Sequence, residues 1–375
     1  MIFSKRKDKS KLILNWDGKI IERVSNYVYL GVPFTEQLNW EFVKNFFVKK
    51  TENALKDLKA LIFRSKMNHF DSILSLFNSL VRSVFSYCAP VWGVNFADSF
   101  EKLRSSFLKS LFLLPTSIPN WFLRLELGLY TSELFFVKLC LKFMVRLASK
   151  KKDTLMYKAY DTMTRIDSYK KCWFVSIKKL CEKWNCQNIL NLINDDTLSS
   201  GSKIVKINQG ICFIEQDSIS LDIVKMRQTK LLRVYMQNKS HCLKESYLND
   251  NYTWGIKQLI FQLKLGISHL THKGIVARIR CLEFKYGYVS DSACQLCGIE
   301  NESTYHILFK CPHYVTERVK YIHSLSLYKN DYEEEDYLKM FNNLSESDAF
   351  KLFNFFNCSL TRRRLYQEEF DSMSS

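Results

Sequence analysis

Residues 134–147 read LFFVKLCLKFMVRL, and this stretch decides the fold class of the chain. Its apolar residues recur at helical spacing, and three charges, Lys138, Lys142 and Arg146, interrupt them. A bilayer crossing needs about 20 predominantly apolar residues, and this segment is the best candidate that the chain offers. We therefore predict a helix here that does not cross a membrane, and we expect no membrane among the partners of the protein.

The same periodicity continues outward on both sides. Asn39 is placed to cap a helix whose apolar face begins with Trp40, Val43 and Phe47. Ser345 and Asp348 form a capping-box pattern before the last helix. With only 11 glycines and 5 prolines, the composition also favours helices over a turn-rich β-sandwich. Further helices are expected near residues 71–87, 100–113, 154–187, 221 onward, 254–265 and 345–358.

Two regions lack this helical periodicity and favour strands instead. Asp17-Gly18 between short apolar runs predicts a hairpin, and residues 27–30 predict a third strand that ends at Gly31. A three-stranded sheet of this size needs another element to cover its apolar face. Residues 195–222 are mixed, and we expect short strands between residues 204 and 214, around Gly210.

The charge balance points to a polyanionic partner. Lys and Arg number 55 against 38 Asp and Glu, a net charge of +17. Nucleic acid is the first partner that this excess suggests and an acidic membrane surface the second, while a basic protein without either is the alternative. No apolar segment follows the basic N-terminal residues, so we expect an intracellular protein of the nucleus or cytoplasm, whose 12 cysteines are thiols or metal ligands.

The sharpest local motif is C-x2-C-x8-H-x4-C, formed by Cys294, Cys297, His306 and Cys311, which we call the CCHC set. Two cysteines separated by two residues can direct both thiolates to one metal, and His306 and Cys311 can add two ligands from one helical turn. Four such ligands without a carboxylate suit a closed, tetrahedral structural Zn²⁺ site. His313 is a competing ligand, and ordinary buried thiols are the alternative interpretation.

A second motif is a row of basic residues at intervals of four: Lys138, Lys142, Arg146 and Lys150, which we call the basic row. Like charges at this spacing destabilise an isolated helix, so a row of phosphates would explain them. A solvated polar face is the alternative. The shorter clusters 5–7 and 362–364 can serve nucleic-acid binding or nuclear import.

Catalytic motifs of the common nucleotide-binding, hydrolase and metalloprotease types are missing from the sequence. Phe96-Ala97-Asp98-Ser99 is similar to the metal-holding turn of polymerases, but Ser99 stands where a second carboxylate is needed. We therefore expect no catalytic residues and no Mg²⁺.

Several motifs together resemble the C-terminal region, thumb plus zinc-binding segment, of a non-LTR retrotransposon reverse transcriptase. Their order along residues 1–322 carries the resemblance more than any one of them. The matching segments are residues 1–4, 29–32, 38–40, 87–92, 114–115 and 125–128, followed by the CCHC set with Pro312, Tyr314 and Arg318 behind it.

The resemblance implies a mainly α fold: a helical thumb-like bundle with a small N-terminal β remnant and a C-terminal CCHC zinc-binding segment. It also implies five parts. They are an end-of-palm β remnant at 1–37, a thumb-like helical domain at 38–150, a helical connector at 151–284, the zinc-binding segment at 285–322 and a helical tail at 323–375.

The function implied is binding of RNA or target DNA. The family's activity is RNA-directed DNA polymerisation, but its metal-binding palm aspartates have no counterpart in this chain, so we expect no polymerase activity from the chain alone. One alternative is a polymerase subunit, or fragment, that acts with a palm supplied by another chain or by a full-length element protein. Another is a non-catalytic interaction scaffold.

Overall fold

The computed structural model shows a mainly helical chain that divides into two compact units. The first unit comprises residues 1–67, 71–104 and 130–217, and the second comprises 68–70, 105–129 and 218–375. The structure describes residues 14–114, 116, 118–166, 172–195, 197–226, 244–249, 252–264, 270–272, 275–277, 293–294, 296–326, 328, 332–333, 337–341 and 344–374.

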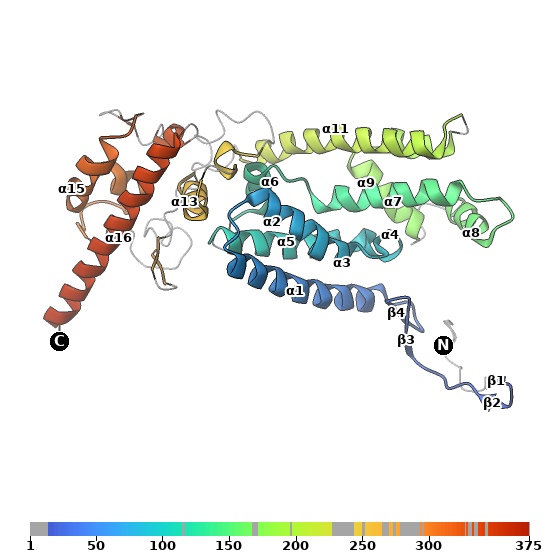
Figure 1. Cartoon of the computed structure of the whole chain (residues 1–375). Helices are drawn as coiled ribbons and strands as arrows, with labels where there is room; N and C mark the ends of the chain where they lie inside the picture. The colour runs from blue at the N-terminus through green and yellow to red at the C-terminus, as the bar shows by residue number, and fades with distance from the viewer. Residues whose placement is uncertain are drawn as a thin grey trace. The chain divides into compact units, whose positions relative to one another are not determined.

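Helices build most of the first unit, and several of the long ones are labelled in Figure 1. The predicted helices near residues 71–87, 100–113 and 134–147 are confirmed, with a π-helical stretch inside the first of them. The helices that lie wholly or partly in this unit are α1 (Trp40–Ser65), α2 (Phe70–Leu76), π-helical η1 (Phe77–Arg82), α3 (Ser83–Ser86), α4 (Ala89–Trp92), η2 (Gly93–Phe96), α5 (Ala97–Leu111), α7 (Ser132–Ala148), α8 (Leu155–Thr164), α9 (Trp173–Lys183), α10 (Gln187–Asn191), η3 (Leu192–Asn194) and α11 (Ser200–Met226).

The long helix α1 begins where the sequence predicts. The side chain of Asn39 accepts a hydrogen bond from the backbone N–H of Glu41 at 3.0 Å, which satisfies one of the free donors of the first turn. Lys66 adopts the left-handed conformation, φ 49°, that ends the helix. One face is buried, through Val43, Phe47, Thr51, Leu55 and Leu58.

Aromatic side chains dominate the core of the first unit. The rings of Phe47 and Trp92 stack with centroids 4.8 Å apart. Phe85 contacts Trp92, Phe100 and Phe136 at 5.1–5.8 Å, which joins α3, α4, α5 and α7. Other buried residues of α7, among them Val137 and Leu141, pack against α9 and α11. The apolar stretch that opened the sequence analysis is therefore the centre of this unit.

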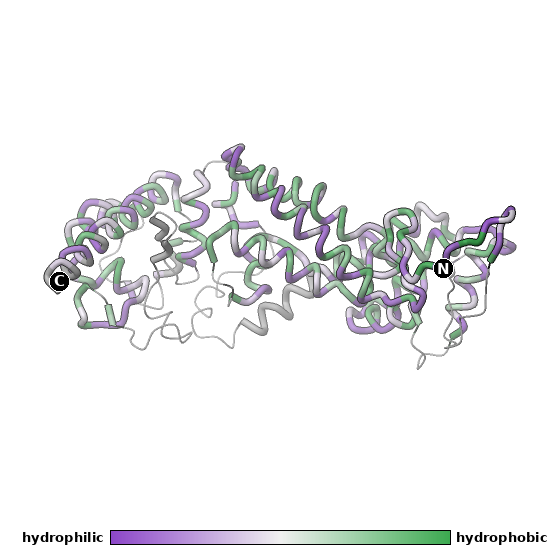
Figure 2. Tube along the Cα trace, turned by 90° about the horizontal axis from the view of Figure 1, so that it is seen from below, coloured by the Kyte–Doolittle hydropathy of each residue, from purple (hydrophilic) through white to green (hydrophobic). Residues whose placement is uncertain are grey.

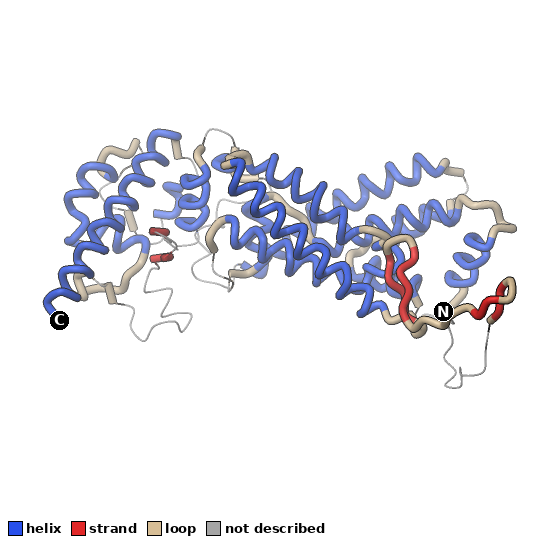
Figure 3. The backbone as a smooth tube through the Cα atoms, turned by 60° about the horizontal axis from the view of Figure 1, so that its bottom comes forward, coloured by secondary structure: helices blue, strands red, loops and turns tan. Residues whose placement is uncertain are grey.

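The N-terminal strands form two separate hairpins instead of one three-stranded sheet, as Figure 3 shows in red. The predicted turn at Asp17-Gly18 is confirmed: it joins β1 (Asn15–Trp16) to β2 (Lys19–Ile20), and both turn residues have positive φ. The expected third strand pairs elsewhere, because Leu30-Gly31 makes a second such turn. It connects β3 (Asn26–Tyr29) to β4 (Val32–Thr35).

Helix α11 corrects the prediction of strands between residues 204 and 214. Ile207 and Ile211 are fully buried at i and i+4, on the face that packs against α7 and α10. Gly210 lies so close to α10 that an added Cβ would stand 2.6 Å from Cδ1 of Ile189. β-Branched residues around a glycine favour a strand locally, but tertiary packing overrides that preference here.

The second unit has its own core. Gln258 and Gln262 donate hydrogen bonds to the carbonyls of Leu111 and Phe112, which secures α13 to the end of α5. The carboxyl-terminal helix begins as the predicted capping box requires, since the backbone N–H of Asp348 donates to Ser345 Oγ at 3.1 Å. The elements of this unit are α6 (Asn120–Leu127), η4 (Ser246–Leu248), α13 (Trp254–Lys264), β5 (Leu270–His272) paired with β6 (Ile275–Ala277), π-helical η5 (His306–Lys310), η6 (Pro312–Tyr314), α15 (Val315–Glu317), π-helical η7 (Arg318–Ile322), η8 (Tyr337–Phe341) and α16 (Glu346–Ser374).

A buried ion cluster lies in the same unit. Nζ of Lys264 is 3.2 Å from a carboxylate oxygen of Glu126 and 2.5 Å from one of Glu245, and Tyr247 donates to Glu126 at 2.7 Å. Buried charges are tolerated when they are paired and hydrogen-bonded in this way. This cluster joins α6, η4 and α13.

Hydrophilic and hydrophobic residues are interspersed along the helices in Figure 2. Within the residues that the structure describes, no helix has both the length and the apolar character needed to cross a membrane.

Candidate metal centre

The first two residues of the CCHC set lie in a closed loop. A β-bridge between Ala293 and Asn301 closes its base, and the backbone N–H of Cys294 donates to the carbonyl of Glu300 at 2.9 Å. Gly298 has φ +66° and donates its N–H to the carbonyl of Cys294, so the chain turns sharply after Cys297. This turn brings the two thiols of the C-x2-C pair to one side of the loop.

The other two residues lie at the ends of the π-helical turn η5. His306 begins it, and the N–H of Cys311 donates to the carbonyl of His306 at 2.7 Å, an i to i−5 bond. Ser303 holds the start of the turn, since its Oγ accepts from the backbone N–H of His306 at 3.0 Å. A π turn thus positions both side chains, where the sequence predicted an ordinary helical turn.

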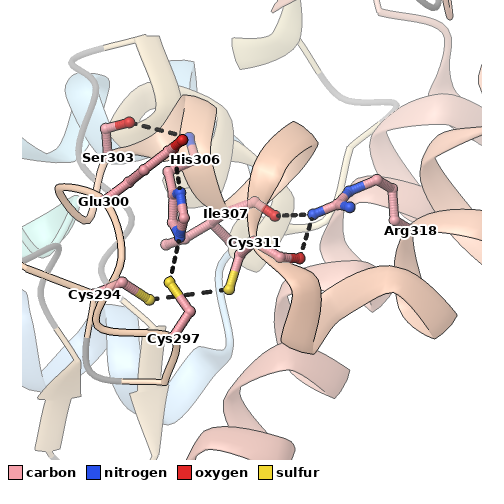
Figure 4. A network of polar contacts seen from close by, with 8 residues as sticks. All are labelled: Cys294, Cys297, Glu300, Ser303, His306, Ile307, Cys311 and Arg318. Carbon is pink, nitrogen blue, oxygen red and sulfur yellow. Dashed lines mark hydrogen bonds and ion pairs between the residues drawn. The ribbon is translucent and has the colours of Figure 1, made fainter.

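The four ligand atoms converge, as Figure 4 shows. The three thiol sulfurs and one imidazole nitrogen all lie within 4.8 Å of one another and can hold a metal ion. Cys297 Sγ is 3.3 Å from His306 Nε2, and the sulfurs of Cys294 and Cys311 are 3.9 Å apart. Cys294, His306 and Cys311 are buried, with exposed fractions of 4% or less, and Cys297 is half-buried.

Protonation in this cluster follows its hydrogen bonds. The hydrogen bond from Cys311 lowers the pKa of Cys294 to about 3, so Cys294 carries the thiolate charge. The same bond raises the pKa of the Cys311 thiol above its ordinary range. Hydrogen bonding to Cys294, helped by Glu300, raises the pKa of His306 to about 9. Metal binding therefore has to displace protons from His306 and Cys311.

Two residues that the motif does not contain support the site. Glu300 accepts a hydrogen bond from His306 Nδ1 at 3.0 Å, which leaves Nε2 facing the thiols, as carboxylates do behind many metal-bound histidines. Arg318 donates to the carbonyls of Leu308 and Cys311 at 2.8 Å and fixes the chain after the π turn. The sequence signal for Glu300 is a carboxylate in the short loop between the two pairs of ligands. For Arg318, the only sequence signal was its position in the family resemblance.

His313, the competing ligand, is not part of the cluster. Its ring contacts Tyr366 on α16, with centroids 5.8 Å apart, and its carbonyl accepts from Arg362. Arg362 also pairs with Glu317 at 2.8 Å, and Arg363 forms two bonds with the buried Glu302. These two arginines of the basic cluster at 362–364 therefore attach α16 to the segment that carries the CCHC set. The cluster at 5–7 lies outside the described residues.

The basic row lies on α7 of the first unit. Lys138 and Lys142 are half-buried and Arg146 is exposed, whereas Lys150 is exposed just beyond the end of the helix. Burial and the charges of Lys138 and Arg146 lower the pKa of Lys142. Lys138 in turn opposes the burial that raises the pKa of Glu215 on α11. The structure thus places three of the four predicted residues on one helical face.

Searches against protein-family models, curated proteins and solved structures find no match to this chain.

Proposed function

We propose that this chain binds RNA or DNA without polymerase catalysis of its own, in the manner of the C-terminal region of a non-LTR retrotransposon reverse transcriptase. The observation that carries this proposal is the crowding of positive charge on α7. Lys142 has a like charge four residues away on each side, and burial together with both neighbouring charges lowers its pKa. Such an arrangement costs folding free energy, and phosphates in a row would offset that cost.

Zinc is the metal that the CCHC set fits best. Three sulfurs and one imidazole nitrogen form the donor set of closed tetrahedral zinc sites, and no carboxylate oxygen belongs to it. A closed set leaves no position for a reacting water, so the metal would order the second unit without taking part in a reaction. The buried donors continue into that unit's hydrophobic core through Cys294 and Cys311.

The test is the salt dependence of binding. Fluorescence anisotropy with labelled single-stranded RNA, single-stranded DNA and duplex DNA should show affinity that falls steeply as salt rises. Substituting Lys138, Lys142 and Arg146 together by Ala should lower affinity about tenfold or more and reduce the slope of log affinity against log salt by about 2. The matched control removes three exposed charges elsewhere in the same unit: Lys158, Lys178 and Lys179.

Equal effects of the two triple variants would place the binding surface elsewhere, and affinity that is flat in salt would overturn the proposal. A primer-extension assay distinguishes the alternative of an active polymerase. The chain alone should give no product, and template-dependent extension would contradict the proposal.

A further inference from the structure

A cavity in the first unit has no role in the proposed function so far. Its volume is about 550 Å³, within the range of roughly 300–1,000 Å³ that is typical of ligand pockets. α1, α4, η2, α7, α8 and α9 contribute its walls. Val91 and Met156 on its lining are 45% and 52% exposed, so the cavity opens to solvent.

Flat aromatic surfaces distinguish this cavity from an aliphatic one. Three indoles line it, from Trp40, Trp92 and Trp173, together with Phe143. Two of the indoles are held by their N–H groups: Trp92 donates to the carbonyl of Tyr87 at 2.9 Å, and Trp173 donates to a carbonyl of α4 at 2.5 Å. Their rings are therefore fixed in place before any ligand arrives.

Trp40 is the ring best placed to stack on a ligand. It is half-buried in the first turn of α1, and among the described residues it takes part in no ring–ring contact, whereas Trp92 stacks on Phe47 and Trp173 meets Phe143 edge to face. Asn95 and Ser176 add hydrogen-bonding groups to the lining. A planar ligand with a polar edge matches this combination of aromatic faces and few polar groups.

The basic row borders the same wall. Phe143 and Leu147 of α7 line the cavity, and Arg146 stands three residues after Phe143, which makes the two neighbours on the helix surface. Lys142 directly precedes Phe143. Aromatic faces beside a row of positive charge are the arrangement by which proteins hold single-stranded nucleic acids, with bases stacked and phosphates paired.

We infer that this cavity receives an unpaired nucleobase of a single-stranded nucleic acid whose phosphates contact the basic row. The inference rests on the proposed function and adds its substrate class: single strands over duplexes. Trp40 stacks on the base, Asn95 and Ser176 face its polar edge, and Lys142 and Arg146 pair with the flanking phosphates. A duplex keeps its bases stacked inside and satisfies only the charged part of this site.

The experiment compares two single strands of equal length and charge, one intact and one with abasic positions along its middle, by anisotropy with the full chain. The intact strand should bind about tenfold more tightly. Trp40→Ala should remove most of that difference and leave the salt slope unchanged, and Trp40→Phe should restore much of it. Trp16→Ala, the same change at a 76% exposed site on β1, is the control and should alter neither affinity.

Equal binding of both strands by the wild-type chain, with a steep salt dependence, would overturn this inference and leave the proposed function intact. Binding of neither strand would overturn both. A neutral apolar dye that occupies the cavity and is not displaced by saturating single strand would show a pocket for a small apolar ligand, and would also overturn the inference. The wild-type comparison decides even if Trp40→Ala fails to fold.

Discussion

The CCHC set and the basic row differ in how the rest of the chain supports them. Every member of the CCHC set is held by its surroundings: Glu300 orients His306, and Arg318 fixes the chain at Cys311. In the basic row, the neighbours of Lys142 are charges of the same sign. The first site is complete within the fold as a set of side chains that can hold a metal ion, whereas for the second we propose a partner that balances its charge.

The spacing of the side chains has a different effect on stability at each of the two sites. Ligands that converge from two segments add the free energy of metal binding to that of folding. Like charges on one helix reduce its stability, and in our proposal a bound polyanion accounts for them. We therefore expect that damage to the CCHC set unfolds the second unit, and that damage to the basic row weakens binding while the fold persists.

The largest expected effect is that of Cys311→Ser. Cys311 is fully buried, and its substitution removes one of the four proposed zinc ligands and leaves a hydroxyl inside the core. The free energy of unfolding of the second unit should fall by at least about 5 kcal/mol, since loss of a metal is among the few changes that cost so much. Thermal unfolding with and without a chelator measures it.

Cys212→Ser is the control for this change, because Cys212 is an exposed free thiol on α11. It should leave the melting curve unaltered. If the chelator failed to shift the wild-type curve, or if Cys311→Ser melted like the wild type, the CCHC set would be a group of ordinary core thiols.

The next effect concerns the attachment of α16. Arg363→Ala removes the two bonds that Arg363 makes to Glu302, whose side chain is 1% exposed, so it should cost about 3 kcal/mol. Arg362→Ala breaks a pair in which the arginine is 43% exposed and should cost less than about 1 kcal/mol. Denaturant titration of both variants measures this contrast. Equal costs would contradict the conclusion that the buried pair of Arg363 contributes more to the attachment of α16 than the exposed pair of Arg362.

Zinc affinity should depend on pH in a definite direction. With its pKa at about 9, His306 is protonated at neutral pH before metal binds, and Cys311 holds its proton because its pKa is raised. Displacement of these two protons alone lowers the affinity at least about 100-fold when the pH falls from 7 to 6. Competition with a chromophoric chelator at each pH measures this, and affinity that is flat in pH would contradict the charge states assigned here.

Periodicity alone identified most of the helices, since α1 and α7 bury continuous stripes over several turns. It failed at α11, where Gly210 between β-branched residues imitates a strand. Close packing of Gly210 against Ile189 favours the helix over a strand. Sequence periodicity does not reveal this contact, because it joins residues far apart in the sequence. The prediction of a three-stranded N-terminal sheet was wrong for a local reason, because the second turn at Leu30-Gly31 was interpreted as the end of a strand.

The members of the CCHC set were predictable because their spacing is that of known zinc-binding motifs. The preference for Cys311 over His313 followed from loop size, and the structure brings Cys311 into the cluster. Contacts from Arg318 and Arg363 were not predictable, since they depend on how η7 and α16 pack. The cavity around Trp40 was not predictable either, because its lining comes from six elements.

The smallest expected effect concerns the basic row itself. Lys142→Ala removes repulsion from Lys138 and Arg146, so the free energy of unfolding of the first unit should rise by a few tenths of a kcal/mol. Lys49→Ala on α1 is the matched control, because Lys49 stands three residues before Glu52 and loses an attraction instead. Denaturant titration should give shifts of opposite sign. A loss of stability in Lys142→Ala would show that this lysine serves the fold.

X-ray absorption spectroscopy of the purified full chain tests the central claim most directly, because it reports the metal and its ligands together. We expect one zinc per chain, with three sulfur ligands at about 2.3 Å and one nitrogen at about 2.0 Å. A chain without metal, or a zinc with oxygen ligands in place of sulfur, would contradict it.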